Sequence, residues 1–399
     1  MKIFRKIHLW LSVPFGIIIT LICFSGAMLI FEPEITRSIK SDVYYAGSSE
    51  GEPRPMGELM ETVKATLPDS VSITGVTVFA DRDRTYQVNL SKPPKASVFI
   101  DQYSGQITGK YERIGFFATM FKLHRWLLDS STPGGDGVKV GKLLVGISTL
   151  IFVIALITGV VIWWPRARKN FRRSMTISFR DGWRGFWKSL HVAGGMYAII
   201  IVLAMSLTGL TWSFNWYRTA FYAVCGVEQT ARNSGESTAA GKSVNRAHVS
   251  ENRGNRVNGR HGGRDKGHRP QPDFSRWQQV YDELNAQNPD ASQITVGAQT
   301  ASVTLGDTGN GRASDIYLVN RKSGEITPAK KYADSLPAGK LSGWIYSVHT
   351  GSWGGLFTRI LWLLGALLGA SLPLTGYYIW IKHLRKKKHH EHIAHQKHH

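Results

Sequence analysis

The sequence predicts an α-helical membrane protein in which a unit of span, outer domain and span is present twice. Three observations indicate this fold class: long windows without Asp, Glu, Lys or Arg, two polar regions between them, and a short internal repeat in the polar regions. A helix needs about 20 apolar residues to cross a hydrocarbon core of about 30 Å. Four windows are long enough, and they cover residues 9–31, 143–164, 189–217 and 360–381.

The composition excludes two other classes of protein. Hydrophobic residues make up 43% of the 399 residues and aromatic residues 11%, which is too much for a chain that is disordered throughout. The only cysteines are Cys23 and Cys225, so a disulfide scaffold is excluded as well.

The first predicted transmembrane helix covers residues 7–31. Its basic start, MKIFRK, is typical of a signal peptide, but the apolar stretch is longer than that of a signal peptide and no small-residue cleavage site follows it. We therefore expect a retained helix. The other predicted transmembrane helices cover 138–164, 187–217 and, with its outer-side approach, 343–381.

Clusters of Lys and Arg set the predicted orientation. They precede the first span and follow the second and fourth, and such clusters favour the cytoplasmic side of a membrane. We expect both termini, the loop 165–186 and the basic, His-rich tail 382–399 in the cytoplasm. The polar regions 32–115 and 218–342 then lie outside a bacterial inner membrane, in the periplasm.

Part of the second polar region, residues 229–272, differs in composition from the rest. It has nine Lys or Arg, three Asp or Glu, seven Gly and almost no large apolar residue. Such a stretch cannot bury a core and is predicted to be a disordered insert. The alternative to a merely solvated loop is a positively charged segment that attracts anionic ligands or nucleic acid. We expect no nucleic-acid partner.

The remaining polar regions contain a repeat. Residues 96–109 read ASVFIDQYSGQITG and residues 313–327 read ASDIYLVNRKSGEIT, which predicts a strand, a polar turn and a second strand in each. The repeat extends to the spans: His8 falls on His191 and Thr158 on Thr375. Both halves leave and re-enter the cytoplasm, so the predicted repeats are parallel and related by an axis along the membrane normal.

Four histidines fall into two pairs under this topology. His8 and His191 begin the outward-going spans on the cytoplasmic side. His124, on a predicted outer-side helix and loop at 116–137, and His349 precede the inward-going spans. Two neutral imidazoles at the same depth can ligate the iron of one haem, so the pattern predicts two haem sites. The alternative is that each histidine only caps a helix or contacts the membrane interface.

Four glycines fit the same plan. Gly26 and Gly209 each lie 18 residues after a cytoplasmic-side histidine, about 27 Å along a helix, at the expected depth of the outer pair. Gly159 and Gly376 lie at the depth of the inner pair. A residue without a side chain leaves room for a porphyrin, and the Ser or Thr before it can bond its own backbone. Simple helix contacts are the alternative.

The expected cofactors are two haem b groups, because no CxxCH sequence is present for thioether attachment. The sequence has neither a Cys cluster for iron–sulfur nor a nucleotide-binding motif, so electrons must come from a cytoplasmic or quinol donor. His383 is a reserve ligand for the inner site, with lipid headgroup contact as the alternative. The tail HHEHIAHQKHH is at most a weak metal site.

The chain resembles the PepSY-associated transmembrane proteins, also called iron-regulated membrane proteins, which include bacterial ferric-siderophore reductases. The matching sequences cover nearly the whole chain: RKIHLWL, VFIDQYSGQITG, FKLHRWLL, TGVVIWWPRAR, KSLHVAGG, IYLVNRKSGEIT and YSVHTGSWGG. The resemblance implies two α+β PepSY-type domains outside the inner membrane and a di-haem b reductase. Its acceptor would be ferric siderophore, with no catalytic residue beyond the haems.

In the expected mechanism, the inner site takes an electron and the outer site delivers it to the chelate. Trp126, Trp344 and Trp353 could shape the delivery face or belong to the interfacial aromatic belt. Two other functions stay open: a non-enzymatic PepSY regulator or assembly protein, and a permease for a metal or siderophore. Permeases usually place polar groups near the midplane, whereas the middles of these four spans are apolar.

Overall fold

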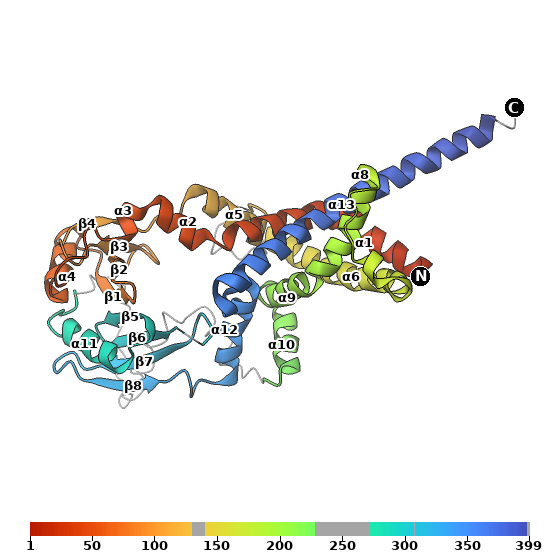
Figure 1. The fold of residues 1–399 in the computed structure, drawn as a ribbon. Helices are drawn as coiled ribbons and strands as arrows, with labels where there is room; N and C mark the ends of the chain where they lie inside the picture. Colours follow the sequence, from red (N-terminus) through yellow and green to blue (C-terminus); the bar gives the residue numbers. More distant parts are fainter. Residues whose placement is uncertain (130–139, 228–270, 307, 397–399) are drawn as a thin grey trace, which may run out of the picture. The chain divides into compact units, whose positions relative to one another are not determined.

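The computed structural model describes residues 1–129, 140–227, 271–306 and 308–396, with side chains to residue 385. These residues form two compact units (Figure 1). One unit comprises Met1–Glu32, Ile114–Cys225 and Ile345–His399, and the other comprises Pro33–Arg113 and Gly226–Trp344. The predicted insert 229–272 lies outside the described residues except for its last two.

The first unit is helical, and its described residues include four helical segments long and apolar enough to cross a membrane, so the chain is a membrane protein. They are Lys2–Leu29, Val140–Lys169, Gly182–Ser213 and Ser352–Arg385. The helices and turns of these segments are α1 (Lys2–Leu29), α6 (Val140–Lys169), α8 (Gly182–Ser189), a π turn (Leu190–Gly194), α9 (Gly195–Ser213), a 3-10 turn (Ser352–Gly354) and α13 (Gly355–Gln396).

The four long helices pack around an apolar centre. α1 contacts α6 and α13, and α9 contacts the same two helices. The buried side chains between them are Ile19, Phe152, Leu156, Ala198, Val202 and Leu372. Shorter helices complete this unit and the connections to the other: α5 (Gly115–Trp126), α7 (Phe171–Ser174), α10 (Asn215–Val224) and α12 (Pro337–Thr350).

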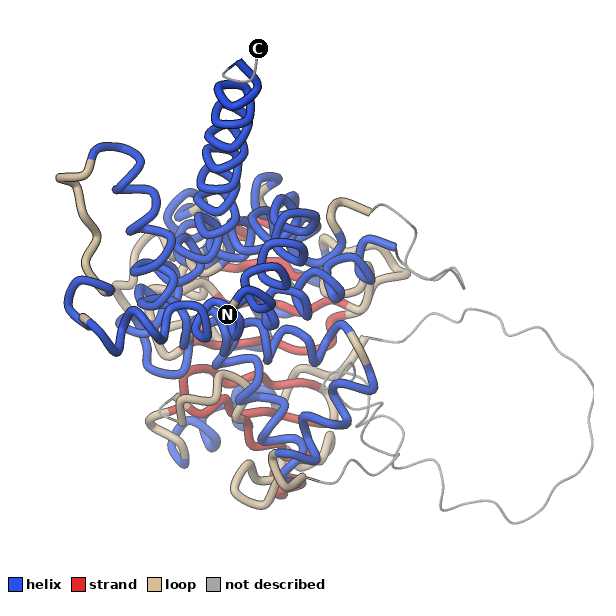
Figure 2. Tube along the Cα trace, turned by 90° about the vertical axis from the view of Figure 1, so that its right-hand side faces the viewer, coloured by secondary structure: helices blue, strands red, loops and turns tan. Residues whose placement is uncertain are grey.

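The second unit contains one antiparallel sheet, whose strands are the red segments in Figure 2. The strand order is β4-β3-β2-β1-β5-β6-β7-β8. The strands are β1 (Ile73–Phe79), β2 (Tyr86–Leu90), β3 (Ser97–Ile100), β4 (Ile107–Lys110), β5 (Ala291–Gly297), β6 (Thr300–Leu305), β7 (Ser314–Val319) and β8 (Ile326–Lys330). Its helices are α2 (Glu32–Ile39), α3 (Ser41–Tyr44), α4 (Met56–Ala65) and α11 (Trp277–Gln287).

The two polar regions of the sequence share one sheet, and each region contributes four of its described strands. β1 and β5 pair antiparallel at its centre, where Gly75 lies opposite Gly297. The hydroxyls of Thr77 and Thr295 are 2.9 Å apart across this junction. Pairing β1 with β5 removes two exposed strand edges, and α4 and α11 contribute to a single apolar core, which a four-stranded half could not bury as completely.

The repeated SGQIT and SGEIT sequences form the same turn. Gly105 and Gly324 have φ of 75° and 76°, a conformation that glycine adopts without steric cost. Asp101 accepts hydrogen bonds from the backbone N–H groups two and three residues later, at 2.9 and 3.3 Å. Asn320 accepts the equivalent two bonds at 3.0 and 3.4 Å. Equal turn chemistry explains why this short sequence recurs.

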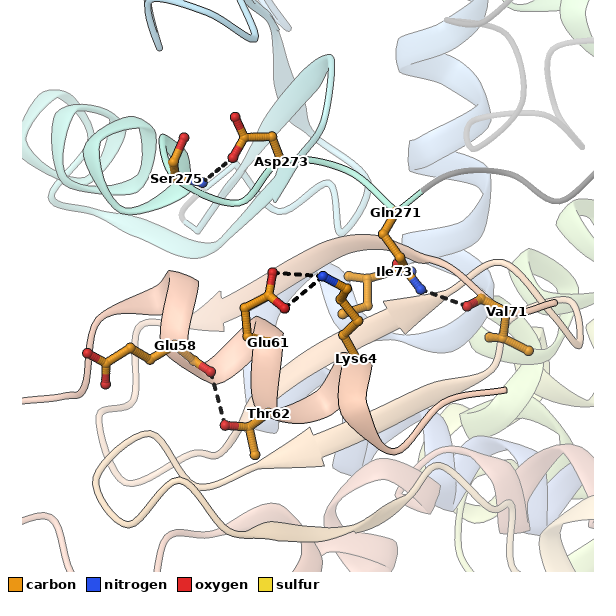
Figure 3. Close-up of polar contacts among 9 residues, drawn as sticks. All are labelled: Glu58, Glu61, Thr62, Lys64, Val71, Ile73, Gln271, Asp273 and Ser275. Carbon is orange, nitrogen blue, oxygen red and sulfur yellow. Dashed lines mark hydrogen bonds and ion pairs between the residues drawn. The ribbon is translucent and has the colours of Figure 1, made fainter. Parts of the chain in front are cut away.

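Gln271 anchors the chain where it returns from the undescribed residues (Figure 3). Its side-chain oxygen accepts the backbone N–H of Ile73 at 3.0 Å, and its amide donates to the carbonyl of Val71 at 2.9 Å. The second-last residue of the predicted insert 229–272 is therefore bonded to the start of β1.

Candidate functional site

His8 and His191 lie side by side within the helical unit. His8 is on α1 and His191 is on the π turn that precedes α9. Their ring centroids are 6.3 Å apart, with an interplanar angle of 82°. A π turn inside a helix often marks a functional position, because the extra residue re-aims one side chain.

His124 and His349 form a second pair in the same unit. His124 is on α5 and His349 is on α12, which are short helices that precede the long helices α6 and α13. Their ring centroids are 6.0 Å apart, with an interplanar angle of 52°. The structure thus brings together the two pairs of histidines that the topology predicted.

Each of the four imidazoles donates from Nδ1 to a backbone carbonyl of a neighbouring helix. The four bonds are His8 to Ala155 at 3.0 Å, His191 to Leu372 at 3.1 Å, His124 to Ile22 at 2.9 Å and His349 to Met205 at 2.9 Å. A carbonyl oxygen can only accept, so the proton of each neutral ring is on Nδ1. Nε2 then carries a free lone pair, the form in which histidine ligates a metal.

The acceptor carbonyls share one local sequence pattern. Each lies four residues before a glycine, and a Ser or Thr stands directly before that glycine. The hydroxyls of Ser25, Thr158, Thr208 and Thr375 donate to these same carbonyls at 2.9 to 3.1 Å. Those of Thr158, Thr208 and Thr375 also lie 2.9 to 3.2 Å from the histidine Nδ1 and help to fix the ring.

Each of the four glycines lies beside one of the four histidines. A Cβ at Gly26 would lie 2.8 Å from Cε1 of His124, and one at Gly209 would lie 3.1 Å from Cε1 of His349. The corresponding distances are 3.6 Å between Gly159 and His8 and 3.4 Å between Gly376 and His191. Each imidazole ring therefore lies beside its glycine and reaches the carbonyl one turn earlier. The ring leaves no room for a Cβ at Gly26 and little at Gly209, whereas a Cβ at Gly159 or Gly376 would make ordinary contact.

A cavity of about 420 Å³ surrounds the first pair. It is lined by His8, His191, Gly159, Gly376 and apolar side chains from α1, α6, α9 and α13. His383, which the sequence offered as a reserve ligand, also lines the cavity. The histidine ring that packs against His191 is that of His8. The volume is within the range of about 300–1,000 Å³ that small-molecule and cofactor sites occupy.

The donor set fits a metal that already carries other ligands. In the part of the chain that the structure describes, no group of three or more His, Cys, Asp or Glu side chains could hold a bare metal ion. Two imidazoles suffice for haem, whose porphyrin supplies the other four donors. His8 with His191 and His124 with His349 are the imidazoles that would hold such a group, since their ring centroids are 6.3 and 6.0 Å apart.

Trp212 is a contact of the second pair that the sequence analysis missed. Its ring packs edge-on against His349, with centroids 5.1 Å apart and an interplanar angle of 77°. Trp212 follows Gly209 by three residues and so lies on the same helix face. This spacing is the feature of the sequence that could have indicated the contact. Of the three tryptophans that were expected near this pair, Trp126 packs on Phe121, Trp353 packs on Trp362 and Trp344 is exposed.

Comparison with known proteins adds one finding. A family model described as PepSY-associated TM region matches residues 5–383, which include all four histidines and all four glycines. No curated protein matches the chain.

Proposed function

The chain belongs to the PepSY-associated TM region family, and from this premise we propose that it is a membrane reductase with two haem b groups. His8 and His191 hold one haem, and His124 and His349 hold the other. The proposal rests on one observation: all four histidines make a hydrogen bond from Nδ1 to a backbone carbonyl. This bond leaves Nε2 of every ring available to iron.

The proposal includes a topology in the bacterial inner membrane. Both termini and the His8–His191 site are on the cytoplasmic side, and the β-sheet unit is in the periplasm. The basic flanks of the spans support this orientation. The two halves are parallel repeats, which the matching residue spacings at the two pairs support.

A bound haem supplies one-electron chemistry, because its iron cycles between the ferric and ferrous states. The protein holds the imidazoles in one tautomer and one orientation. Their Nδ1–H bonds to carbonyls make Nε2 a stronger donor, which favours the ferric state and hence outward electron donation. Apolar side chains between the helices exclude water from the path between the two pairs.

The proposed substrate is a ferric siderophore on the periplasmic side. Siderophore oxygens bind the hard Fe(III) ion much more tightly than Fe(II), so one added electron loosens the complex and leaves the chelator intact. The reaction is balanced by one electron from a cytoplasmic or quinol donor, which is oxidised as Fe(III) becomes Fe(II).

The apolar bundle centre favours this function over a permease. The buried cluster between the helices consists of Ile, Phe, Leu, Ala and Val side chains, while translocation paths usually carry polar groups near the midplane. A regulator or assembly protein would not need four imidazoles with a fixed tautomer.

The experiment is an absorption study of the detergent-purified full chain. A pyridine haemochrome assay should count two b-type haems per chain, with the sharp reduced bands of six-coordinate iron. The dithionite-reduced protein is then mixed with a ferric siderophore or, as the control, with the gallium(III) complex of the same siderophore. Gallium(III) matches iron(III) in charge but accepts no electron.

Rapid reoxidation by the ferric complex alone is the expected result. A protein without haem, purified from cells that supply haem, would overturn the reductase proposal and leave the PepSY regulator. Reoxidation by neither complex would refute the siderophore as the acceptor.

A further inference from the structure

Four basic side chains line the cavity at the His8–His191 pair. They are Arg5 on α1, Arg166 on α6, Lys188 on α8 and His383 on α13. The described residues that line the cavity include no Asp or Glu. Among the residues that the structure describes, no ion pair joins Arg5, Arg166 or Lys188 to an acid. We call these four residues the basic collar.

The spacing of the basic collar follows that of the site residues. Arg5 precedes His8 by three residues, and Lys188 precedes His191 by three. Both basic side chains line the same cavity as the histidine that follows them.

The other two members of the collar repeat a second spacing. Arg166 follows Gly159 by seven residues, and His383 follows Gly376 by seven. Seven residues are close to two helical turns, which again gives one face. The four collar residues therefore occupy two pairs of equivalent positions around one cavity.

Cationic side chains around an apolar cavity repel one another, and an anion bound beside them offsets this electrostatic repulsion. The matching ligand has an apolar body, two imidazole-binding positions and carboxylates at one edge. We propose that Arg5, Arg166 and Lys188, with His383 as the fourth member, bind the porphyrin carboxylates of the haem held by His8 and His191. This inference rests on the proposed function and names the residues that orient the cofactor.

The shared chemistry is recognition of an anionic oxygen group by Arg and Lys, so a lipid phosphate is the competing source. The experiment must separate the two. It compares haem with haem dimethyl ester, in which both carboxylates are methylated and uncharged while the iron and the macrocycle are unchanged.

The test uses the full chain with His349→Ala, which is expected to leave only the first site able to bind haem. The protein is produced in haem-deficient cells and titrated in neutral detergent by the Soret absorbance. The test variant carries Arg5→Gln, Arg166→Gln and Lys188→Gln. The matched control carries Arg168→Gln, Lys169→Gln and Arg172→Gln, which remove the same charge from residues that do not line the cavity.

The protein with an unchanged collar should bind haem about a hundredfold more tightly than haem dimethyl ester, because the ester cannot form charge-assisted bonds from its carboxylates. The collar variant should bind both forms equally, and the control should keep the preference. Transfer of haem from the loaded protein to apomyoglobin provides a second readout, and it should be about tenfold or more faster in the collar variant.

Equal preference in the collar variant and in the control would overturn the inference. It would also be overturned if anionic phospholipid, added at fixed haem concentration, abolished the preference of the unsubstituted collar, since the collar would then serve a lipid headgroup. Failure of the unsubstituted chain to bind either form would instead overturn the proposed function.

Discussion

The glycines at the two pairs allow a graded test of the site. Replacing Gly26 by Ala places a Cβ 2.8 Å from Cε1 of His124, whereas carbon atoms pack at about 3.5 Å or more. The ring must retreat from α1 by roughly 0.7 Å. The bond from Nδ1 to the carbonyl of Ile22, now 2.9 Å, would lengthen to about 3.6 Å, at which it is no longer a hydrogen bond.

Two opposing effects set the change in haem-binding free energy that Gly26→Ala should cause. Overpacking in a packed interior costs about 1–3 kcal/mol, and Ala in place of Gly stabilises a helix by about 1 kcal/mol. Gly26→Ala should therefore weaken haem binding at the second pair by up to about 2 kcal/mol, or roughly thirtyfold. Gly159→Ala is the matched control, because its Cβ would lie 3.6 Å from His8 in ordinary contact. It should be neutral or stabilising.

The four substitutions have a predicted order. Haem loss should fall from Gly26→Ala through Gly209→Ala to Gly376→Ala and Gly159→Ala, since the distances rise from 2.8 through 3.1 and 3.4 to 3.6 Å. The assay is haem per chain, with electron paramagnetic resonance to identify which low-spin centre is lost. Equal retention in all four variants, or greatest loss in Gly159→Ala, would refute the close-contact reasoning.

Four further predictions test single contacts. His349→Ala should halve the haem content and leave one low-spin centre; retention of both haems would show that the pairing is wrong. Trp212→Leu should weaken the same site by about 0.5–1.5 kcal/mol through the lost edge contact, measured as haem transfer to apomyoglobin. Thr375→Val should cost only about 1 kcal/mol at the first pair, because a carbonyl acceptor remains; complete haem loss would contradict this. Gly75→Ala brings a Cβ 2.8 Å from a carbonyl of β5 and should destabilise the sheet by about 1–3 kcal/mol, seen as faster amide exchange around Gly297 and unchanged haem content.

The sequence could predict much of the site because its signals are local. A charge-free window of about 20 residues fixes a span, and the alternation of spans fixes which histidines share an end of the bundle. The offset that relates His8 to His191 also relates their helices. The Ser-Gly and Thr-Gly pairs could also be found in the sequence, but the side chains that contact them could not. The structure places an imidazole ring beside each glycine.

Contacts between helices could not be predicted in the same way. The carbonyl that each Nδ1 reaches depends on the rotation and crossing of two helices, which no single period encodes. The π turn at Leu190–Gly194 and the ring contact of Trp212 with His349 depend on the same geometry. The convergence of Arg5, Arg166 and Lys188 on one cavity required the positions of three helices.

The sequence alone determined the membrane class, the four spans and the division of the histidines into two pairs, since hydrophobic length and chain order decide these. Only the tertiary structure decided that the two polar regions form one sheet through β1 and β5. It also decided the tautomer of each histidine and the residues around the cavity. Pairing of distant strands and donation to a neighbouring helix are non-local interactions, and their partners are fixed by packing in three dimensions.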